Sequence, residues 1–411
     1  MRELLVRNRD FRRLFLASVV SMAGDWFSFV AVAGLVTELT GRPGAPAFVY
    51  AATVLPVFVA SPIAGAIADR FDRKRILVIA DLVRVPIALA LCAAAWWRST
   101  PLAIAAVTAL AVGASFSDPI ASAATPNLVD DDDLATAQSL MGAVWGSMLM
   151  VGAGIGGLVA ELFGRQTAFV VDAASFLTSA WLIAGIRRPT QAAAARREDR
   201  AGGAGGAAGS LRDAIGYIRG APVVLRLVFA KGGVCSANGI VGLLPAFAAS
   251  RFAGTSIATG LLFAARGLGA MVGPMLARGV IGATPGRRAI AAACGVSTLA
   301  YCLVYAMFPL VPAFAAALVM VTIAHLGGGA QWSLSTYGLQ RETPDQFRGR
   351  VLSLDYGLAT LLIGASSIAA GLLADAWGAE AATWWLAALG GGYCVAWLVW
   401  SLRELKPDLE R

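Results

Sequence analysis

Long apolar segments separated by short polar loops make up almost all of this chain of 411 residues. A helix needs about 20 apolar residues to cross the hydrocarbon core of a bilayer. By that rule the pattern predicts an all-α integral membrane protein with twelve transmembrane helices. The expected helices run from Leu14 to Glu38, Pro46 to Ala68, Ile76 to Trp96, Pro101 to Ala123, Leu134 to Ala160, Gln166 to Ile186, Val223 to Ala249, Ser256 to Val280, Ala289 to Phe308, Val311 to Thr336, Val351 to Ala376 and Ala381 to Leu402.

Segments of the first half of the chain return in the second half at a constant offset. The loop that starts at Gly65 reappears in weakened form at Gly279, which is 279 − 65 = 214 residues later. At the same offset, Gly157-Leu-Val-Ala-Glu161-Leu-Phe-Gly164 returns as Gly371-Leu-Leu-Ala-Asp375-Ala-Trp-Gly378. Internal repeats of this kind are typical of membrane transporters. They predict two pseudo-symmetric six-helix halves, 1–186 and 211–411, joined by a cytoplasmic linker at 187–210 rich in Ala, Gly and Arg.

The charged residues are few and unevenly placed. They make up 14% of the chain, against about 25% in soluble domains, while 58% of the residues are hydrophobic. Most of the basic residues that give the net charge of +8 lie in loops on one side of the predicted membrane, and the other side has only Arg42, Arg98, Arg165 and Arg251. Both termini are therefore expected in the cytoplasm, and this placement argues against nucleic-acid binding.

The five cysteines all lie within apolar segments and have no metal-ligand spacing, so they are interpreted as packing residues. Outside the predicted spans there is no histidine, and the chain lacks both a metal-binding His pair and a phosphate-binding loop. Nothing in the sequence therefore supports an enzyme, and no metal or cofactor is expected.

The loop after the second predicted span carries a known signature. Gly65, Asp69, Arg70, Arg73 and Arg75 match the Gly-x-x-x-Asp-Arg-x-Gly-Arg-x-Arg pattern of the major facilitator superfamily, with Asp72 in place of the second Gly. The chain therefore resembles this superfamily across nearly its whole length. Together with Arg7-Asn-Arg-Asp10-Phe-Arg12, Gly24-Asp25-Trp26 and Arg348-Gly-Arg350-Val-Leu-Ser, the variant loop is similar to the branch of enterobactin exporters and macrolide efflux pumps. The resemblance implies a monomer in the bacterial cytoplasmic (inner) membrane.

The resemblance also implies a cytoplasmic latch made of Gly65, Asp69, Arg70, Arg73 and Asp118. Asp69 can accept backbone N–H groups at the start of the eleventh helix, near Gly349, where the helix dipole is positive. Arg73 can reach Asp118 at the cytoplasmic end of the fourth helix. In the second copy Ala283 stands at the position of Asp69, so the latch is expected to be one-sided. The alternative is that these basic residues only set the topology.

Polar residues recur at helical spacing on four of the predicted spans. The sets are Ser18, Ser21, Asp25 and Ser28; Thr108, Ser115, Asp118 and Ser122; Lys231, Cys235 and Asn238; and Thr322, His325, Gly329 and Trp332. They lie on helices one, four, seven and ten, which line the central cavity in the superfamily. The residues expected to contact substrate are Ser21, Trp26, Ser115, Lys231, Asn238, Arg266, His325 and Trp332.

Charged residues within the spans need a partner or water, because a bare charge in lipid is costly. Asp25 and Asp172 would balance Lys231 and Arg266, although the sequence does not assign the pairs. We hypothesise that Asp25 is the proton-coupling carboxylate, because burial favours its neutral form and a nearby cation favours its ionised form. The alternative is a permanently ionised Asp25 in a fixed ion pair.

Other charged or titratable groups have a structural interpretation. Asp81 and Arg84, three residues apart, are expected to form a local structural pair. His325 is the single histidine and could relay protons, or it could pack as a neutral side chain.

The leading hypothesis is a secondary active exporter that exchanges protons for an amphiphilic small molecule by alternating access. Two patterns of proton-coupled members are missing: Leu110 to Ser122 contains no base, and Ala153 stands where the antiporter pattern of helix five has Pro. The alternatives are an importer, a lipid transporter or an uncoupled facilitator of the same fold.

Overall fold

The computed structural model describes residues 2–190, 206–252, 254–282 and 285–404, and these residues form helices and short connections without a strand. The helices of the N-terminal half are α1 (Arg2–Arg7), α2 (Arg9–Thr40), α3 (Ala45–Arg70), α4 (Arg73–Trp96), α5 (Thr100–Leu128), α6 (Asp131–Leu162) and α7 (Arg165–Ala184). Those of the C-terminal half are α9 (Gly206–Gly220), α10 (Pro222–Phe229), α11 (Gly232–Ala237), α12 (Gly239–Arg251), α13 (Ser256–Ile281), α14 (Arg287–Met307), η1 (Phe308–Leu310), α15 (Phe314–Glu342) and α16 (Asp345–Glu404). Most of the predicted linker, 191–205, lies outside the described residues.

The predicted spans all correspond to helices of the structure. Within the described residues, ten helical segments are long and apolar enough to cross a membrane, and α10 to α12 count as one of them. One of these ten, α16, contains the last two predicted spans, which meet at Gly378 (φ 89°). The apolar part of α3, Ala45–Ala60, supplies the remaining span. The structure is therefore an all-helical bundle with twelve membrane crossings.

Two expected boundaries need correction. The seventh span was expected to be continuous from Val223 to Ala249, but it is divided into α10, α11 and α12 by breaks at Ala230–Lys231 and Asn238. Lys231 therefore lies directly before α11, and its backbone stays in the right-handed helical region (φ −74°, ψ −15°). The spans also extend into their polar flanks, because capping side chains prolong the helices: the Asn8 side chain accepts from Phe11 N, and the Asp72 side chain accepts from Arg75 N.

The repeated segments end the fifth and eleventh spans in the same way. Gly164 and Gly378 both have left-handed backbones, with φ values of 86° and 89°. This region strongly favours glycine, because a Cβ atom there meets the backbone. The offset of 214 residues in the sequence thus corresponds to two matched turns, 378 − 164 = 214.

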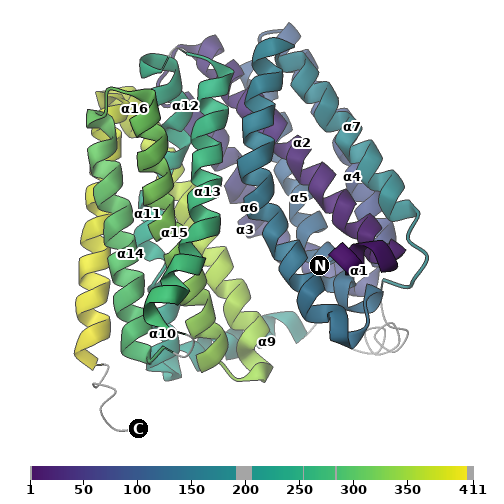
Figure 1. Ribbon diagram of the computed structural model, residues 1–411, viewed down its shortest axis with the longest axis vertical. Coiled ribbons are helices and arrows are strands. Elements are labelled where there is room, and N and C mark those ends of the chain that lie inside the picture. Colours follow the sequence, from purple (N-terminus) through teal and green to yellow (C-terminus); the bar gives the residue numbers. More distant parts are fainter. Residues whose placement is uncertain (1, 191–205, 253, 283–284, 405–411) are drawn as a thin grey trace.

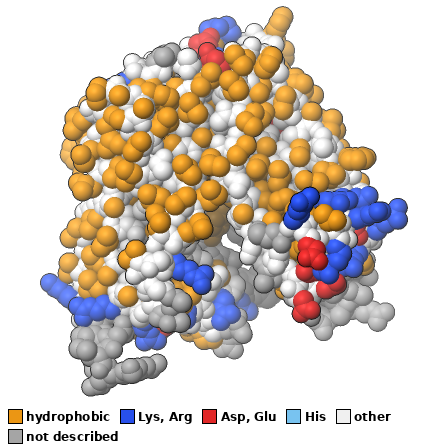
Figure 2. Space-filling model, in the orientation of Figure 1, with side chains coloured by type: hydrophobic (Ala, Val, Ile, Leu, Met, Phe, Trp, Pro, Cys, Tyr) orange, Lys and Arg blue, Asp and Glu red, His pale blue; other side chains and the backbone are white. Residues whose placement is uncertain are grey.

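The two halves lie side by side, with the N-terminal half in purple and blue and the C-terminal half in green and yellow (Figure 1). Helix α6 packs against α13, and α3 packs against α16. We call the end of the bundle with α1, α9 and the last residues of α16 the terminal end, and the end with the turns at Gly41, Gly164 and Gly378 the distal end. Figure 2 shows that the surface is hollowed between the halves at the terminal end.

Candidate functional site

A cluster of charged side chains is buried inside the N-terminal half. We call Asp25, Asp81, Arg84 and Asp172 the acidic cluster; they lie on α2, α4 and α7. The Arg84 side chain, 1% exposed, forms an ion pair with Asp25 and lies 3.8 Å from Asp81. It also donates to Ser21 Oγ at 3.2 Å, and its guanidinium lies 3.9 Å from the centre of the Phe176 ring. Arg84 is therefore the centre of the cluster.

Asp172 lies on the other side of the cluster. It accepts a hydrogen bond from Ser28, and Ser175 Oγ lies 3.5 Å from its carboxylate. Gly24 lets α2 and α7 approach here, because a Cβ atom at this position would lie 2.5 Å from the Asp172 carboxylate. Arg84 therefore contacts two carboxylates, Asp25 and Asp81, and interacts electrostatically with the third, Asp172.

A small pocket lies beside the acidic cluster, on the side of the cluster toward the terminal end. It is lined by polar and apolar residues of α2, α4, α5 and α7: Leu14, Ser18, Ser21, Met22, Asp25, Leu77, Asp81, Arg84, Ala114, Ser117, Ala121, Ser179 and Ile183. Asp25, Asp81 and Arg84 therefore border a partly polar pocket.

The structure assigns the charge pairs that the sequence left open, and it contains the expected contact between Asp81 and Arg84. Asp25 pairs with Arg84 rather than with Lys231 or Arg266, so Arg84 and Asp81 are not merely a local pair. Lys231 pairs instead with Asp355 on α16 at 2.6 Å, and its Nζ lies 5.2 Å from the centre of the Trp332 ring. Sequence reasoning missed Asp355, although an acid one turn inside a predicted span was a visible signal.

Arg266 has a different environment, made of aromatic groups from both halves. Its Nη2 donates to Tyr50 Oη at 3.1 Å, and the same hydroxyl lies 3.1 Å from Asn238 Oδ1. Its guanidinium lies 5.6–5.9 Å from the ring centres of Tyr50, Phe263 and Trp145. The sequence analysis did not single out these aromatic residues, since single aromatic residues in apolar spans carry no distinguishing pattern.

The remaining predicted cavity residues are buried or half-buried. His325 packs against Tyr301 and Tyr305, with Nδ1 3.3 Å from Tyr305 Oη. Trp26 packs on Phe29 and Phe263, with ring centres 5.6 and 5.9 Å apart. Ser115 donates to the Ala111 carbonyl of its own helix, so it satisfies its hydroxyl locally.

The predicted latch falls largely outside what the structure describes. The side chains of Gly65, Asp69, Arg70 and Asp118 are not among the described ones. Arg73 is described, and its Nη1 donates to the Ala123 carbonyl near the end of α5 at 2.8 Å. Gly349, at the proposed receiving end of α16, is exposed.

The distal end, by contrast, is closed by the repeated segments that contain Glu161 and Asp375. The Glu161 carboxylate accepts from Ser256 N at the start of α13 at 2.8 Å, and the Asp375 carboxylate accepts from Gly44 N at the start of α3 at 2.9 Å. Arg42 also pairs with Asp375. Each carboxylate thus caps a helix of the opposite half. We call these contacts the distal seam.

Glycines allow the helices of the distal seam to approach closely. A Cβ atom at Gly157 would lie 2.5 Å from the Ser256 carbonyl, and one at Gly260 would lie 2.5 Å from the Ala153 carbonyl. At the terminal end, four contacts each lie within one half: Asn8 with Leu128, Lys74 with Ile186, Tyr217 with Glu342 and Arg287 with Glu342. Together with the hollow between the halves at this end (Figure 2), they indicate that the halves meet at the distal end and lie apart at the terminal end.

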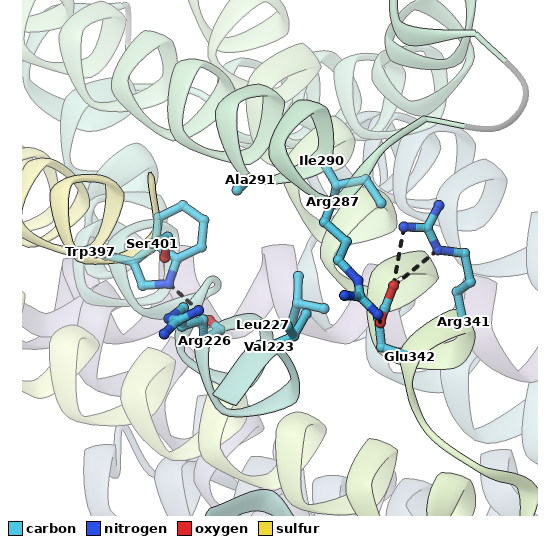
Figure 3. Close-up of a pocket in the computed structure, with 10 residues that line it drawn as sticks. All are labelled: Val223, Arg226, Leu227, Arg287, Ile290, Ala291, Arg341, Glu342, Trp397 and Ser401. Carbon is cyan, nitrogen blue, oxygen red and sulfur yellow. Dashed lines mark hydrogen bonds and ion pairs between the residues drawn. The ribbon is translucent and has the colours of Figure 1, made fainter. Parts of the chain in front are cut away.

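A second pocket lies inside the C-terminal half, between α10, α14, α15 and α16 (Figure 3). Arg287 and Arg341 converge there on Glu342, at 2.6 and 3.2 Å. Trp397 Nε1 donates to the Arg226 carbonyl at 2.9 Å. Because this pocket is enclosed by helices of a single half, it does not form part of a path between the halves.

Comparisons with known proteins agree with this architecture. The solved structure of a POT family transporter in complex with 5-aminolevulinic acid superposes with a TM-score of 0.74 at 12% identity, over 97% of each chain. A D-xylose-proton symporter superposes with a TM-score of 0.71 at 13% identity, over 97% of this chain and 98% of the symporter. At these identities the similarity shows the major facilitator fold alone.

Sequence relatives include named efflux pumps. The multidrug efflux pump Tap of Mycolicibacterium fortuitum is 26% identical over 379 residues, 90% of each chain. Macrolide efflux protein A of Streptococcus pyogenes is 22% identical over 181 residues, 44% of this chain and 45% of that protein. The match to YkuC, an uncharacterised MFS-type transporter of Bacillus subtilis, is 26% identical and spans less than half of that relative, 44%.

The family comparison covers more of the chain. A family model described as a transmembrane secretion effector matches residues 5–407. Because this match includes both halves and all the helices that span the membrane, the protein belongs to the transmembrane secretion effector family of the major facilitator superfamily, and it is a multi-pass membrane transporter.

Proposed function

We propose that this protein is a proton-coupled exporter of amphiphilic small molecules in the bacterial cytoplasmic membrane. The observation that carries the proposal is the acidic cluster, in which Asp25 and Asp81 contact Arg84 and line a partly polar pocket, with Asp172 close by. The efflux activity named for two relatives supports the direction of transport. The protein is proposed to act as a monomer and without a cofactor, because both halves of the path belong to one chain.

The charge balance of the acidic cluster links protonation to conformation. When all three carboxylates are ionised, Arg84 neutralises only one of their charges. The excess negative charge is costly away from water, and a proton on one carboxyl group lowers that cost. Proton binding therefore favours a state in which the cluster is sealed, and proton loss favours one in which water reaches it. We assign the exchanged proton to Asp25, because its side chain is 33% exposed, whereas that of Asp81, the other carboxylate that lines the pocket, is 3% exposed.

The arrangement of the two ends supports alternating access. We propose that the terminal end faces the cytoplasm, in line with its basic loops, and that the distal seam faces the opposite side. The conformation described here is then the inward-facing one. In the outward-facing state the distal seam opens, and the loop that contains Asp69 and Arg73 closes the terminal end.

Transport into everted membrane vesicles tests the proposal. Vesicles containing the protein are energised and supplied with a panel of macrolides, tetracyclines, siderophores and cationic dyes, with and without a proton ionophore. At least one compound is expected to accumulate, and the ionophore is expected to abolish its accumulation. Accumulation of none of them, or accumulation indifferent to the ionophore, would refute proton-coupled export.

Two variants separate coupling from folding. Asp25→Asn keeps the size of the side chain but cannot exchange a proton, so its transport is expected not to respond to an imposed pH gradient. Arg278→Gln, which changes an exposed base at the end of α13, is the control and is expected to respond like the unmodified protein. A full pH response by Asp25→Asn would remove the role assigned to Asp25.

A further inference from the structure

We propose that Arg266 forms an anion-binding subsite in the transport path, and that the substrates of this protein are aromatic or planar amphiphiles with one anionic group. This inference rests on the proposed function, because it names the substrate class of the same path. The argument starts from the position of Arg266. It stands ten residues into α13, 266 − 256 = 10. That is roughly 15 Å along the helix, near the middle of a membrane core of about 30 Å.

Arg266 is a buried cation without a carboxylate partner among the described residues. Its residue exposure is 7%, and its Nε and Nη1 atoms make no hydrogen bond. The single side-chain partner that accepts from it is the neutral hydroxyl of Tyr50. Two other intramembrane cations differ in this respect: Lys231 pairs with Asp355, and Arg84 pairs with Asp25. A desolvated guanidinium with spare donors attracts an anion more strongly than either of those neutralised groups.

The surroundings of Arg266 suit an aromatic ligand body. Trp26, Phe29, Tyr50 and Phe263 form a continuous wall, with ring centres of neighbouring members 5.0–6.0 Å apart. These residues come from α2, α3 and α13, so the wall joins the two halves. Trp145 on α6, whose ring centre lies 5.9 Å from the guanidinium, is 47% exposed. Phe29 and Tyr50 are 5% exposed and Phe263 is fully buried, so a planar ring would stack on this wall when the two halves move apart, while its anionic group reaches the spare donors of Arg266.

Calorimetry with three matched probes tests the subsite. The purified full-length protein is titrated with 2-naphthoate, 2-naphthalenemethanol and 2-naphthylmethylammonium, which share one ring system and differ in charge. The anion is expected to bind at least about tenfold more tightly than the neutral probe, as for other charge-assisted hydrogen bonds. Equal affinities, a preference for the cation, or no binding of naphthoate at millimolar concentration would overturn the proposal.

Variants at Arg266 identify the group responsible. Arg266→Gln is expected to lose the preference for naphthoate while it keeps the affinity for the neutral probe, which also shows that it is folded. Arg266→Lys keeps the charge but not the fork of donors, and an intermediate preference is expected. The control Arg278→Gln, on the same helix, is expected to keep the full preference. An Arg266→Gln variant that still prefers the anion would overturn the assignment. If that variant does not fold, an Arg266→Lys variant that keeps the full preference for naphthoate would overturn it instead.

Transport of the same probes distinguishes this proposal from the proposed function. Everted vesicles that accumulate none of the three probes, combined with an intact anion preference in calorimetry, would count against the exporter and leave the subsite standing. Vesicles that accumulate all three probes equally would support the exporter and reject the subsite.

Discussion

The two halves of the molecule hold buried charge in opposite ways. In the N-terminal half, Arg84 contacts two carboxylates, Asp25 and Asp81, and interacts electrostatically with a third, Asp172. In the C-terminal half, Lys231 has one carboxylate, Asp355, and Arg266 has aromatic rings and a hydroxyl. The first half thus carries excess acid and the second excess base. The difference teaches that one pseudo-symmetric fold can place proton binding in one half and anion binding in the other.

Removing the cation of each half is the strongest way to test this comparison. Arg84→Met is expected to destabilise the protein by about 3–5 kcal/mol, because it leaves buried carboxylates without a cation. The loss is expected to be larger at pH 8 than at pH 5, since protonated carboxyl groups need no cation. Thermal unfolding of the purified protein in detergent at both pH values measures the effect.

Adding a second substitution that removes one carboxylate shows how many buried carboxylates each cation stabilises. Lys231→Met combined with Asp355→Asn is expected to regain nearly all the stability lost in Lys231→Met, because that pair is isolated. Arg84→Met combined with Asp25→Asn is expected to regain only part of it, because Asp81 and Asp172 remain. Equal recovery in both halves would mean that the acidic cluster is a simple pair.

The distal seam gives a prediction of intermediate size. Combining Glu161→Gln with Asp375→Asn weakens two helix-capping contacts, each expected to contribute about 1 kcal/mol. Together they are expected to raise the population of molecules open at the distal end roughly tenfold or more. The reporter is Ala47→Cys, which is buried against Gly242, and its labelling by a membrane-impermeant maleimide from the distal side measures the opening.

Controls for this measurement come from the same chain. The seam variant without Ala47→Cys gives the background from the five native cysteines, of which four are buried. Arg278→Gln with Ala47→Cys is expected to be labelled as slowly as Ala47→Cys alone. Unchanged labelling in the seam variant would show that the repeated carboxylates do not hold the distal end closed.

The smallest effect is expected at His325. Its ring packs between Tyr301 and Tyr305 and contacts the Tyr305 hydroxyl, so we interpret it as a packing group rather than a proton relay. His325→Gln is expected to change the rate of transport by less than about threefold, with an unchanged response to an imposed pH gradient. If this variant lost the pH response while its thermal stability stayed normal, the proton relay would lie in the C-terminal half rather than in the N-terminal half.

The comparison also shows which features of the site were visible in the sequence. The polar face of helix one led to Asp25 and Ser21, and both contact Arg84. Arg84 itself was assigned to Asp81, because a spacing of three residues indicates a neighbour on the same helix and gives no sign of a neighbour on another. The structure brings Asp25 closer, since α7 packs on both α2 and α4 and places the guanidinium of Arg84 next to α2.

The sequence alone determined the twelve crossings, the constant offset of 214 residues and the family resemblance. These follow from hydrophobic length and local motif, which depend on residues close together in the chain. Only the tertiary structure decided which charges pair, that Arg266 faces aromatic rings, and that the repeats at Glu161 and Asp375 seal one end. Such choices depend on the rotation and approach of helices far apart in the chain, and in lipid those are set by close packing at small residues such as Gly157 and Gly260.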